Sequence, residues 1–253
     1  MSACNAFEDS QLPLFHGGRA VVPAPGPERQ PSYIAGHRKR LRDRFAEGGA
    51  DAMPDYELLE LLLFRSLARG DVKPLARRLL DAFGDLNAVI AAPEARLNEV
   101  PGVGQAIIHD LKLVQAVAHR MARARVMDRP VLSGWQALLD YCHTRMSHRG
   151  TEQVRVFFLD RKNILIADEA QGEGTVDHVP VYPREIVKRA LELNASALIL
   201  VHNHPSGDPT PSQADIAMTR QIAAGAEALG LVLHDHVIIG KSAELSFRAD
   251  GYL

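Results

Sequence analysis

The sequence predicts a two-domain protein of mixed class, in which a small all-helical domain precedes an α/β domain built on a mixed sheet. As far as residue 126, apolar residues recur mainly at helical spacing, whereas from Glu152 onward short apolar strands alternate with helices. The chain opens on a Pro- and Gly-rich stretch that can sustain neither a helix nor a central strand. We therefore expect a flexible extension over residues 1–34, a helical domain over 35–126 and an α/β domain over 131–253.

The composition is typical of a soluble globular chain. The 253 residues are 46% hydrophobic and 24% charged, and the net charge of -2 argues against a protein that is basic throughout. A small excess of basic residues lies in the first half, so any nucleic-acid contact is expected from a local patch there. The two cysteines, Cys4 and Cys142, form neither a disulfide framework nor a zinc site. No membrane-length apolar run and no signal peptide are visible, so we expect a cytoplasmic protein without a membrane partner.

The first domain is predicted to contain a series of helices. A cationic run that includes Arg38, Lys39 and Arg40 opens the first of them. Asp55 is expected to cap a second, nearly all-apolar helix, and a third begins at Asp71 and is stopped by a glycine. Short helical pieces over 86–90 and 93–97 then lead to a long helix that ends near residue 125.

A tight turn, Pro101-Gly102-Val103-Gly104, separates the last short helix from the long one. A helix, this turn and a second helix resemble the helix-hairpin-helix of DNA-binding proteins. Gly102 and Gly104 would let the backbone approach closely, and exposed amides at the second helix could bind a phosphate without reading sequence. The cationic run at residues 38–40 could add contacts to the DNA backbone. The alternative, a helical corner packed inside the domain with the cationic run as a solvated face, stays open.

The second domain is predicted to begin with a helix and continue as strands and helices. Ser133, with Gln136 three residues later, is a capping-box pattern for the first helix. Alternation of residues along the chain from Glu152 predicts a strand and a hairpin. Glycines within 172–174 are then expected to interrupt the strand pattern before a short edge strand at 176–181. A helix starting at Pro183, a buried strand over 197–201, a helix over 216–229 and a strand over 231–239 complete the domain.

Two histidines, His202 and His204, follow the buried strand. Side chains two apart on a strand point the same way, so both can bind one ion. Asp215 lies in the first turn of the next helix, where the chain returns toward the strand end. Two imidazoles and a carboxylate leave one position of a tetrahedral zinc open, which is typical of a catalytic site. A second His-x-His at residues 234–236 has no matching serine and aspartate after it, and we interpret it as structural or supporting.

The spacing His-x-His, seven residues, Ser, two residues, Asp is the signature of the JAMM/MPN metalloprotease family, and His202, His204, Ser212 and Asp215 match it. The wider context, over 183–185, 202–208 and 235–240, resembles the bacterial RadC family, in which a helix-hairpin-helix region precedes a JAMM-type domain. The resemblance covers roughly residues 36–253. It implies a cytidine-deaminase-like mixed-sheet fold and one Zn²⁺ per chain bound by His202, His204 and Asp215, with water in the fourth place. It also implies Glu152 as general base and Ser212, besides capping the helix, as a donor to the oxyanion.

The leading functional hypothesis is a zinc-dependent metallopeptidase that cleaves a peptide or isopeptide bond of an unidentified protein or peptide substrate. The alternative is a protein that binds DNA structures in repair or recombination through its helical domain, with the second domain as a partner or nuclease module. A zinc nucleobase deaminase would need a Pro-Cys-x-x-Cys segment, which this chain lacks. Neither hypothesis specifies an oligomeric state.

Overall fold

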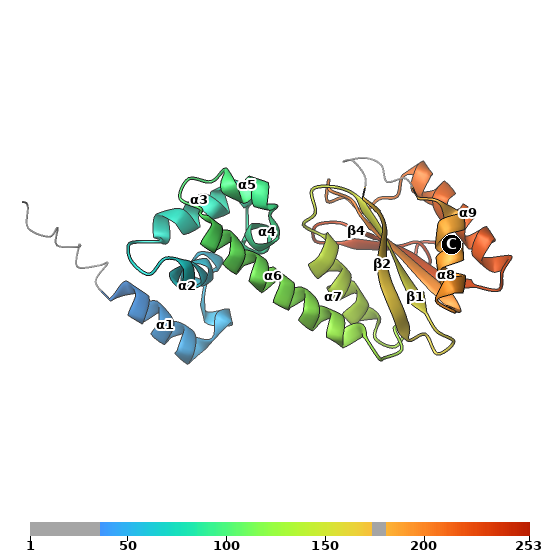
Figure 1. Ribbon diagram of the computed structural model, residues 1–253, viewed down its shortest axis with the longest axis horizontal. Coiled ribbons are helices and arrows are strands. Elements are labelled where there is room, and N and C mark those ends of the chain that lie inside the picture. Colours follow the sequence, from blue (N-terminus) through green and yellow to red (C-terminus); the bar gives the residue numbers. More distant parts are fainter. Residues whose placement is uncertain (1–35, 174–180) are drawn as a thin grey trace, which may run out of the picture. The chain divides into compact units, whose positions relative to one another are not determined.

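The structure, a computed structural model, describes residues 36–173 and 181–253 (Figure 1). The predicted extension over 1–34 and nearly all of the predicted edge strand over 176–181 lie outside these residues. A helical N-terminal region and a later mixed sheet with its helices fit the predicted two-domain layout, and the exact domain boundaries stay a prediction. No helix among the described residues has both the length and the apolar character needed to cross a membrane.

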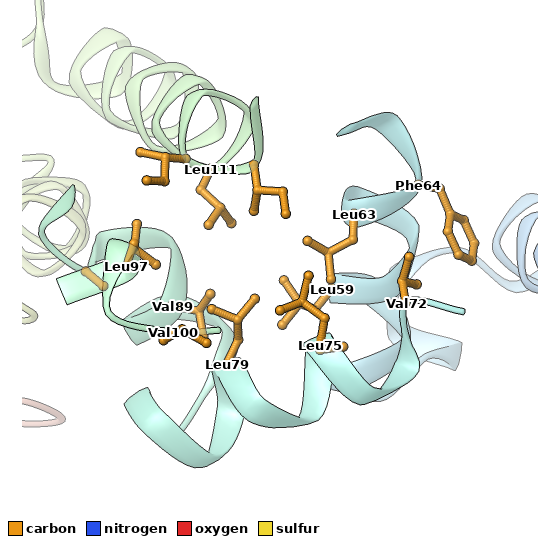
Figure 2. Close-up of a cluster of buried hydrophobic side chains, with 14 of the residues drawn as sticks. Leu59, Leu63, Phe64, Val72, Leu75, Leu79, Val89, Leu97, Val100 and Leu111 are labelled. Carbon is orange, nitrogen blue, oxygen red and sulfur yellow. The ribbon is translucent and has the colours of Figure 1, made fainter. Parts of the chain in front are cut away.

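The described N-terminal region is helical, as predicted. Its elements are α1 (His37–Gly48), a 3₁₀ turn (Ala50–Ala52), α2 (Asp55–Ser66), α3 (Lys73–Phe83), α4 (Leu86–Ala91), α5 (Glu94–Asn98) and α6 (Gln105–Val126). Figure 2 shows how leucines of α2 and α3 point toward Leu111 of α6, with Val89 and Leu97 from the two short helices beside them. Short helices are marginal alone in water, so this shared apolar core is what holds them.

Two helix starts differ from the sequence prediction. Asp55 does not cap α2: Pro54 occupies the N-cap position, and the Asp55 carboxylate instead accepts a hydrogen bond from the N–H of Leu86 at the start of α4 (3.3 Å). The third helix begins at Lys73 rather than Asp71, whose carboxylate accepts from the N–H of Lys73 (3.0 Å). In both cases the carboxylate satisfies a helix-start amide that would otherwise lack a partner, but not at the predicted position.

The C-terminal sheet is mixed, as predicted, with the strand order β2-β1-β3-β4-β5. Strand β1 runs antiparallel to β2 and β3, β3 runs parallel to β4, and β4 runs antiparallel to β5. The bounds are β1 (Gln153–Leu159), β2 (Leu165–Glu173), β3 (Ala197–Asn203), β4 (Val232–Ile239) and β5 (Glu244–Ser246). The prediction that glycines interrupt the strand pattern from residue 172 is wrong, because β2 continues to Glu173. Its pairing with β1 instead shifts register between Val154 and Arg155.

Helices cover both faces of this sheet (Figure 1). Helix α7 (Trp135–Met146) packs with Phe157 and Ile199 on one face, and α8 (Pro183–Glu192) and α9 (Gln213–Glu227) pack with Phe158 and Leu200 on the other. Every residue of β1 and β3 is buried. The ends of these two strands are therefore held in place from both sides.

The predicted capping box at the start of α7 is wrong. Gly134 is the N-cap, and the Ser133 hydroxyl donates backward to the carbonyl of Pro130 (2.9 Å). The side chain of Gln136 donates to Asp140 (3.1 Å) and not to the helix start. Serine and glutamine in this spacing can each find another local partner, so the pattern alone does not fix the cap.

We expect Leu79→Ala in α3 to lower the free energy of unfolding by about 2–5 kcal/mol, because Leu79 is fully buried and its truncation leaves a cavity. The matched control is Leu113→Ala in α6, where the side chain is 55% exposed and the change should cost less than about 0.5 kcal/mol. Urea unfolding followed by far-UV circular dichroism measures both. Equal losses in the two variants would contradict the core shown in Figure 2.

Candidate metal centre

Strand β3 lies in the middle of the sheet and carries the two predicted histidines at its end. His202 pairs with Val154 of β1 and with Ile238 of β4. His204, just beyond the strand, donates its backbone N–H to the carbonyl of Ile239 (3.0 Å). The backbone is thus fixed up to His204, and the Nε2 atoms of the two histidines lie 3.0 Å apart.

The loop after His204 folds tightly against the loop that follows β4. Gly207 has a φ of +91°, which favours glycine, and donates its N–H to the carbonyl of His204 (3.0 Å). A Cβ atom on Gly240 would lie 2.4 Å from the carbonyl oxygen of Gly207, so only glycine allows the two loops to approach this closely. This close packing anchors the start of the loop that leads from the end of β3 to α9.

Ser212 and Asp215 form a capping box at the start of α9, which confirms the predicted cap. The Ser212 hydroxyl accepts from the N–H of Asp215 (3.1 Å), and the Asp215 atom Oδ2 accepts from the N–H (2.8 Å) and the hydroxyl (2.6 Å) of Ser212. The carboxylate is therefore held in one orientation. Its other oxygen, Oδ1, lies 3.3 Å from Nε2 of His202.

The three predicted ligand side chains meet with spacings that suit one metal ion. The separations are 3.0 Å between the two histidine Nε2 atoms, 3.3 Å from His202 Nε2 to Asp215 Oδ1 and 3.6 Å from His204 Nε2 to Asp215 Oδ2. Ligands about 2.0–2.1 Å from a tetrahedral zinc lie about 3.3 Å from one another. Donor type and spacing therefore both fit a metal ion.

Glu152 completes the group, since its ligand atom and those of the other three residues all lie within 4.8 Å of one another. It is buried, immediately before β1, and its Oε1 lies 3.8 Å from Nε2 of His202. Asn203, between the two histidines, bonds to the backbone on both sides of Glu152. Its Oδ1 accepts from the N–H of Gln153 (3.0 Å), and its amide donates to the carbonyl of Thr151 (3.1 Å). The backbone at Glu152 is therefore tied to β3.

The electrostatics suit cation binding. Burial lowers the pKa of His202 to about 4, so its ring is neutral at pH 7. Burial alone would raise the pKa of Asp215, but the nearby rings of His204 and His202 and the hydrogen bonds from Ser212 lower it well below the ordinary range and keep the carboxylate ionised. The nearby Asp215 carboxylate raises the pKa of His204.

Sequence reasoning missed Asn203 and Thr219, and it gave the second His-x-His only a general supporting role. His236 accounts for that role, because its ring lies 2.7 Å from Nδ1 of His202 and 2.6 Å from the hydroxyl of Thr219. His234 instead contacts the side chain of Asn163 (2.7 Å). The sequence held one signal for the contact between His202 and His236, since each of the two His-x-His pairs follows an apolar run. These two runs form the strands β3 and β4, which pair in parallel.

The residues predicted to contact nucleic acid do not meet at one place among the described contacts. Arg38 lies over the ring of Phe64, 4.4 Å from its centroid, and donates to the carbonyl of Gly70 (3.1 Å). Lys39 and Arg40 are exposed on α1. The turn at Gly102 lies instead against α3, where Arg78 Nε donates to the carbonyl of Pro101 (3.2 Å). Gly104 is the N-cap of α6, with no side-chain hydrogen bond to the helix start.

Comparisons with known proteins match two family models to separate parts of the chain. Residues 132–252 match the model of the RadC-like JAB domain, and residues 35–108 match the UPF0758 N-terminal model. A UPF0758 protein of Ruegeria pomeroyi is 75% identical over 223 residues, which are 88% of this chain and the whole of the relative. A UPF0758 protein of Rhodobacter capsulatus is 76% identical over 213 residues, 84% of this chain and again the whole relative. The chain therefore belongs to the RadC family, with a UPF0758 N-terminal domain before its JAB domain.

Proposed function

We propose that this protein is a zinc-dependent hydrolase of the JAMM type that cleaves a peptide or isopeptide bond. The observation that carries the proposal is the arrangement of His202, His204 and Asp215 at tetrahedral spacing with the carboxylate of Glu152 beside them. Two imidazoles and one carboxylate favour zinc over Mg²⁺ or Ca²⁺, which prefer oxygen ligands throughout. Three protein ligands leave a position for water, as hydrolytic zinc sites require.

When bound, zinc would supply a water of pKa ~7 and polarise the carbonyl of the substrate. Glu152 is the group placed to accept a proton from that water and to pass it to the leaving nitrogen. Its buried position close to His202 and the tie of its backbone to Asn203 hold it for this role. Proton transfer at this carboxylate is the step that the chain itself supplies.

Ser212 is the proposed donor to the oxyanion, but its hydroxyl proton is already engaged. It donates to Oδ2 of Asp215 at 2.6 Å while the oxygen accepts from the N–H of Asp215. Donation to a substrate oxygen therefore requires the hydroxyl to rotate away from the carboxylate. In this proposal Ser212 has two tasks, since it also holds Asp215 in the orientation of a ligand.

We expect the purified protein to contain one zinc per chain, measured by elemental analysis. His204→Ala should weaken zinc binding by more than about 100-fold, a larger loss than the roughly 10–100-fold typical of residues that only support a ligand. His204 is at the edge of the site, so this change is easier to tolerate than one at the fully buried His202. Glu152→Gln should keep the full zinc content. A wild-type protein without stoichiometric metal would contradict the proposed site.

Glu152→Gln should lower turnover of a peptide or lysine-linked isopeptide substrate by about 10²–10⁴-fold, because it removes the general base and keeps the size of the side chain. Activity-based screening of a peptide and isopeptide library with the zinc-loaded wild type supplies the substrate. Glu185→Gln, an exposed glutamate in the first turn of α8, is the control and should leave turnover unchanged. Full activity in Glu152→Gln would rule out its proposed role.

A second candidate function is the binding of DNA structures by the helical region, in repair or recombination, with the JAB domain as a partner or nuclease module. It is favoured by the exposed start of α6, where Gly102 has a φ of +94° and Gly104 leaves the first amides without a side-chain cap. Uncapped amides at a helix start can bind a phosphate. Arg78 lies against the same turn and adds positive charge.

Gly104→Val tests this candidate without straining the backbone. A Cβ at Gly104 meets nothing within 4 Å and the residue has no positive φ, whereas a change at Gly102 would distort the turn. If this turn binds DNA, affinity for a branched duplex should fall with rising salt and drop about tenfold or more in the variant, because the side chain separates amides from phosphate. Gly150→Val, at an equally open position, is the control. Salt-independent binding, or equal binding by both variants, would exclude this surface.

A further inference from the structure

Behind the predicted ligand His202 runs a chain of three short hydrogen bonds. Nδ1 of His202 lies 2.7 Å from Nε2 of His236, and Nδ1 of His236 lies 2.6 Å from the Thr219 hydroxyl. That hydroxyl in turn lies 2.6 Å from the backbone carbonyl of Asp215. His202, His236 and Thr219 have no exposed surface, so water cannot replace any of these partners. The chain joins β3, β4 and α9.

The direction of every bond in this chain follows from its last member. A carbonyl oxygen can only accept, so the single hydroxyl hydrogen of Thr219 goes to Asp215. The hydroxyl oxygen must then accept from Nδ1 of His236. With its hydrogen on Nδ1, a neutral His236 has a lone pair on Nε2, and this lone pair accepts from Nδ1–H of His202. The hydrogen of His202 is thereby fixed on Nδ1.

This tautomer leaves the lone pair of His202 on Nε2, the atom that faces His204 and Asp215. We propose that Thr219 and His236 are positioning residues that hold His202 in its metal-binding tautomer and ring orientation and thereby increase the affinity of the site for a divalent ion. The inference rests on the proposed metal site. The opposite tautomer would place a hydrogen on Nε2, between the two histidine rings, where it would block the ion.

The packing around His236 supports a positioning role. Its ring stacks on the fully buried ring of Phe247, with centroids 4.5 Å apart and planes inclined by 33°. The backbone of Phe247 also donates its N–H to the carbonyl of His236 (2.9 Å). The ring of His236 is therefore confined and cannot swing away from His202. Partners behind a metal-binding histidine commonly set affinity by orienting it and fixing its tautomer.

Asp215 takes part both in the candidate site and in the hydrogen-bond chain behind His202. The carboxylate of this residue faces the ligand atoms of both histidines, and its carbonyl anchors the hydrogen-bond chain behind His202. A shift in the first turn of α9 would therefore disturb one predicted ligand directly and a second one through Thr219. We expect the supporting bonds and the ligand geometry to be lost together.

The test compares Thr219→Val, which removes the hydroxyl and keeps the shape, with Thr219→Ser, which keeps the hydroxyl. Zn²⁺ affinity is measured by competition with a chromogenic chelator, and the visible spectrum of bound Co²⁺ reports ligand geometry. Thr219→Val should weaken Zn²⁺ binding by about 10–100-fold and alter the Co²⁺ spectrum, whereas Thr219→Ser should stay within about threefold of wild type. Long-range ¹H–¹⁵N spectra of the metal-free protein should show the hydrogen of His202 on Nδ1 in wild type and a mixture in Thr219→Val.

His236→Gln, with His234→Gln as control on the same strand, gives a second comparison, and only the first should weaken Zn²⁺ binding. Thermal unfolding of each variant separates a local effect from loss of fold. The inference is overturned if wild type binds Zn²⁺ and Thr219→Val binds it equally well, or if Thr219→Ser weakens binding as much as Thr219→Val. A wild type that binds neither Zn²⁺ nor Co²⁺ would instead remove the proposed function, and this inference with it.

Discussion

The candidate site depends first on the capping box between Ser212 and Asp215. A helix start leaves backbone amides without partners, and these two residues satisfy amides at the start of α9 reciprocally. The same bonds take up one oxygen of the Asp215 carboxylate and fix the direction of the other toward His202. A local requirement of helix formation thus orients a predicted ligand, and the stability of α9 and the geometry of the site share one interaction.

The second constraint is the central position of β3. A strand with neighbours on both sides cannot shift its register without moving its side chains to the wrong face, and β3 is paired with β1 and β4. On each side, one side-chain contact also links the site to the neighbouring strand. On the β1 side, Asn203 holds the backbone around Glu152, and on the β4 side, His236 meets His202. The group of four residues is thus braced through both strands that flank β3.

The part of the site that could be predicted from the sequence is the part encoded over short distances. Two histidines two apart after an apolar run, and a serine and aspartate three apart at a helix start, carry their geometry in their spacing. Short-range patterns still fail where several partners compete, and Ser133 bonds backward to Pro130 instead of capping α7. The assignment of Glu152 came from the resemblance to a family, because a glutamate before a strand has no distinctive spacing.

The contacts of the supporting residues could not have been predicted, because these residues meet only after the sheet has formed. His202 and His236 are 34 residues apart, and Asn203 and Gln153 are 50 apart, so each contact depends on the register of a strand pair. The helical region shows the same limit. Its helices follow from periodicity, but Asp55 bonds to the start of a helix 31 residues away instead of capping its own.

The nature of the group behind His202 also bears on the charge of the site. Metal-binding histidines often donate to a carboxylate, which adds negative charge behind the ring. Here the partner is a second imidazole, and burial lowers the pKa of His236 far enough to keep it neutral. A divalent ion held by His202, His204 and Asp215 would therefore retain one net positive charge, with Glu152 as the nearby anion. Retained positive charge favours ionisation of a bound water, and a carboxylate beside it provides the acceptor for the proton. A neutral support behind the ligand and an anion in front of it would therefore suit the proposed activation of water.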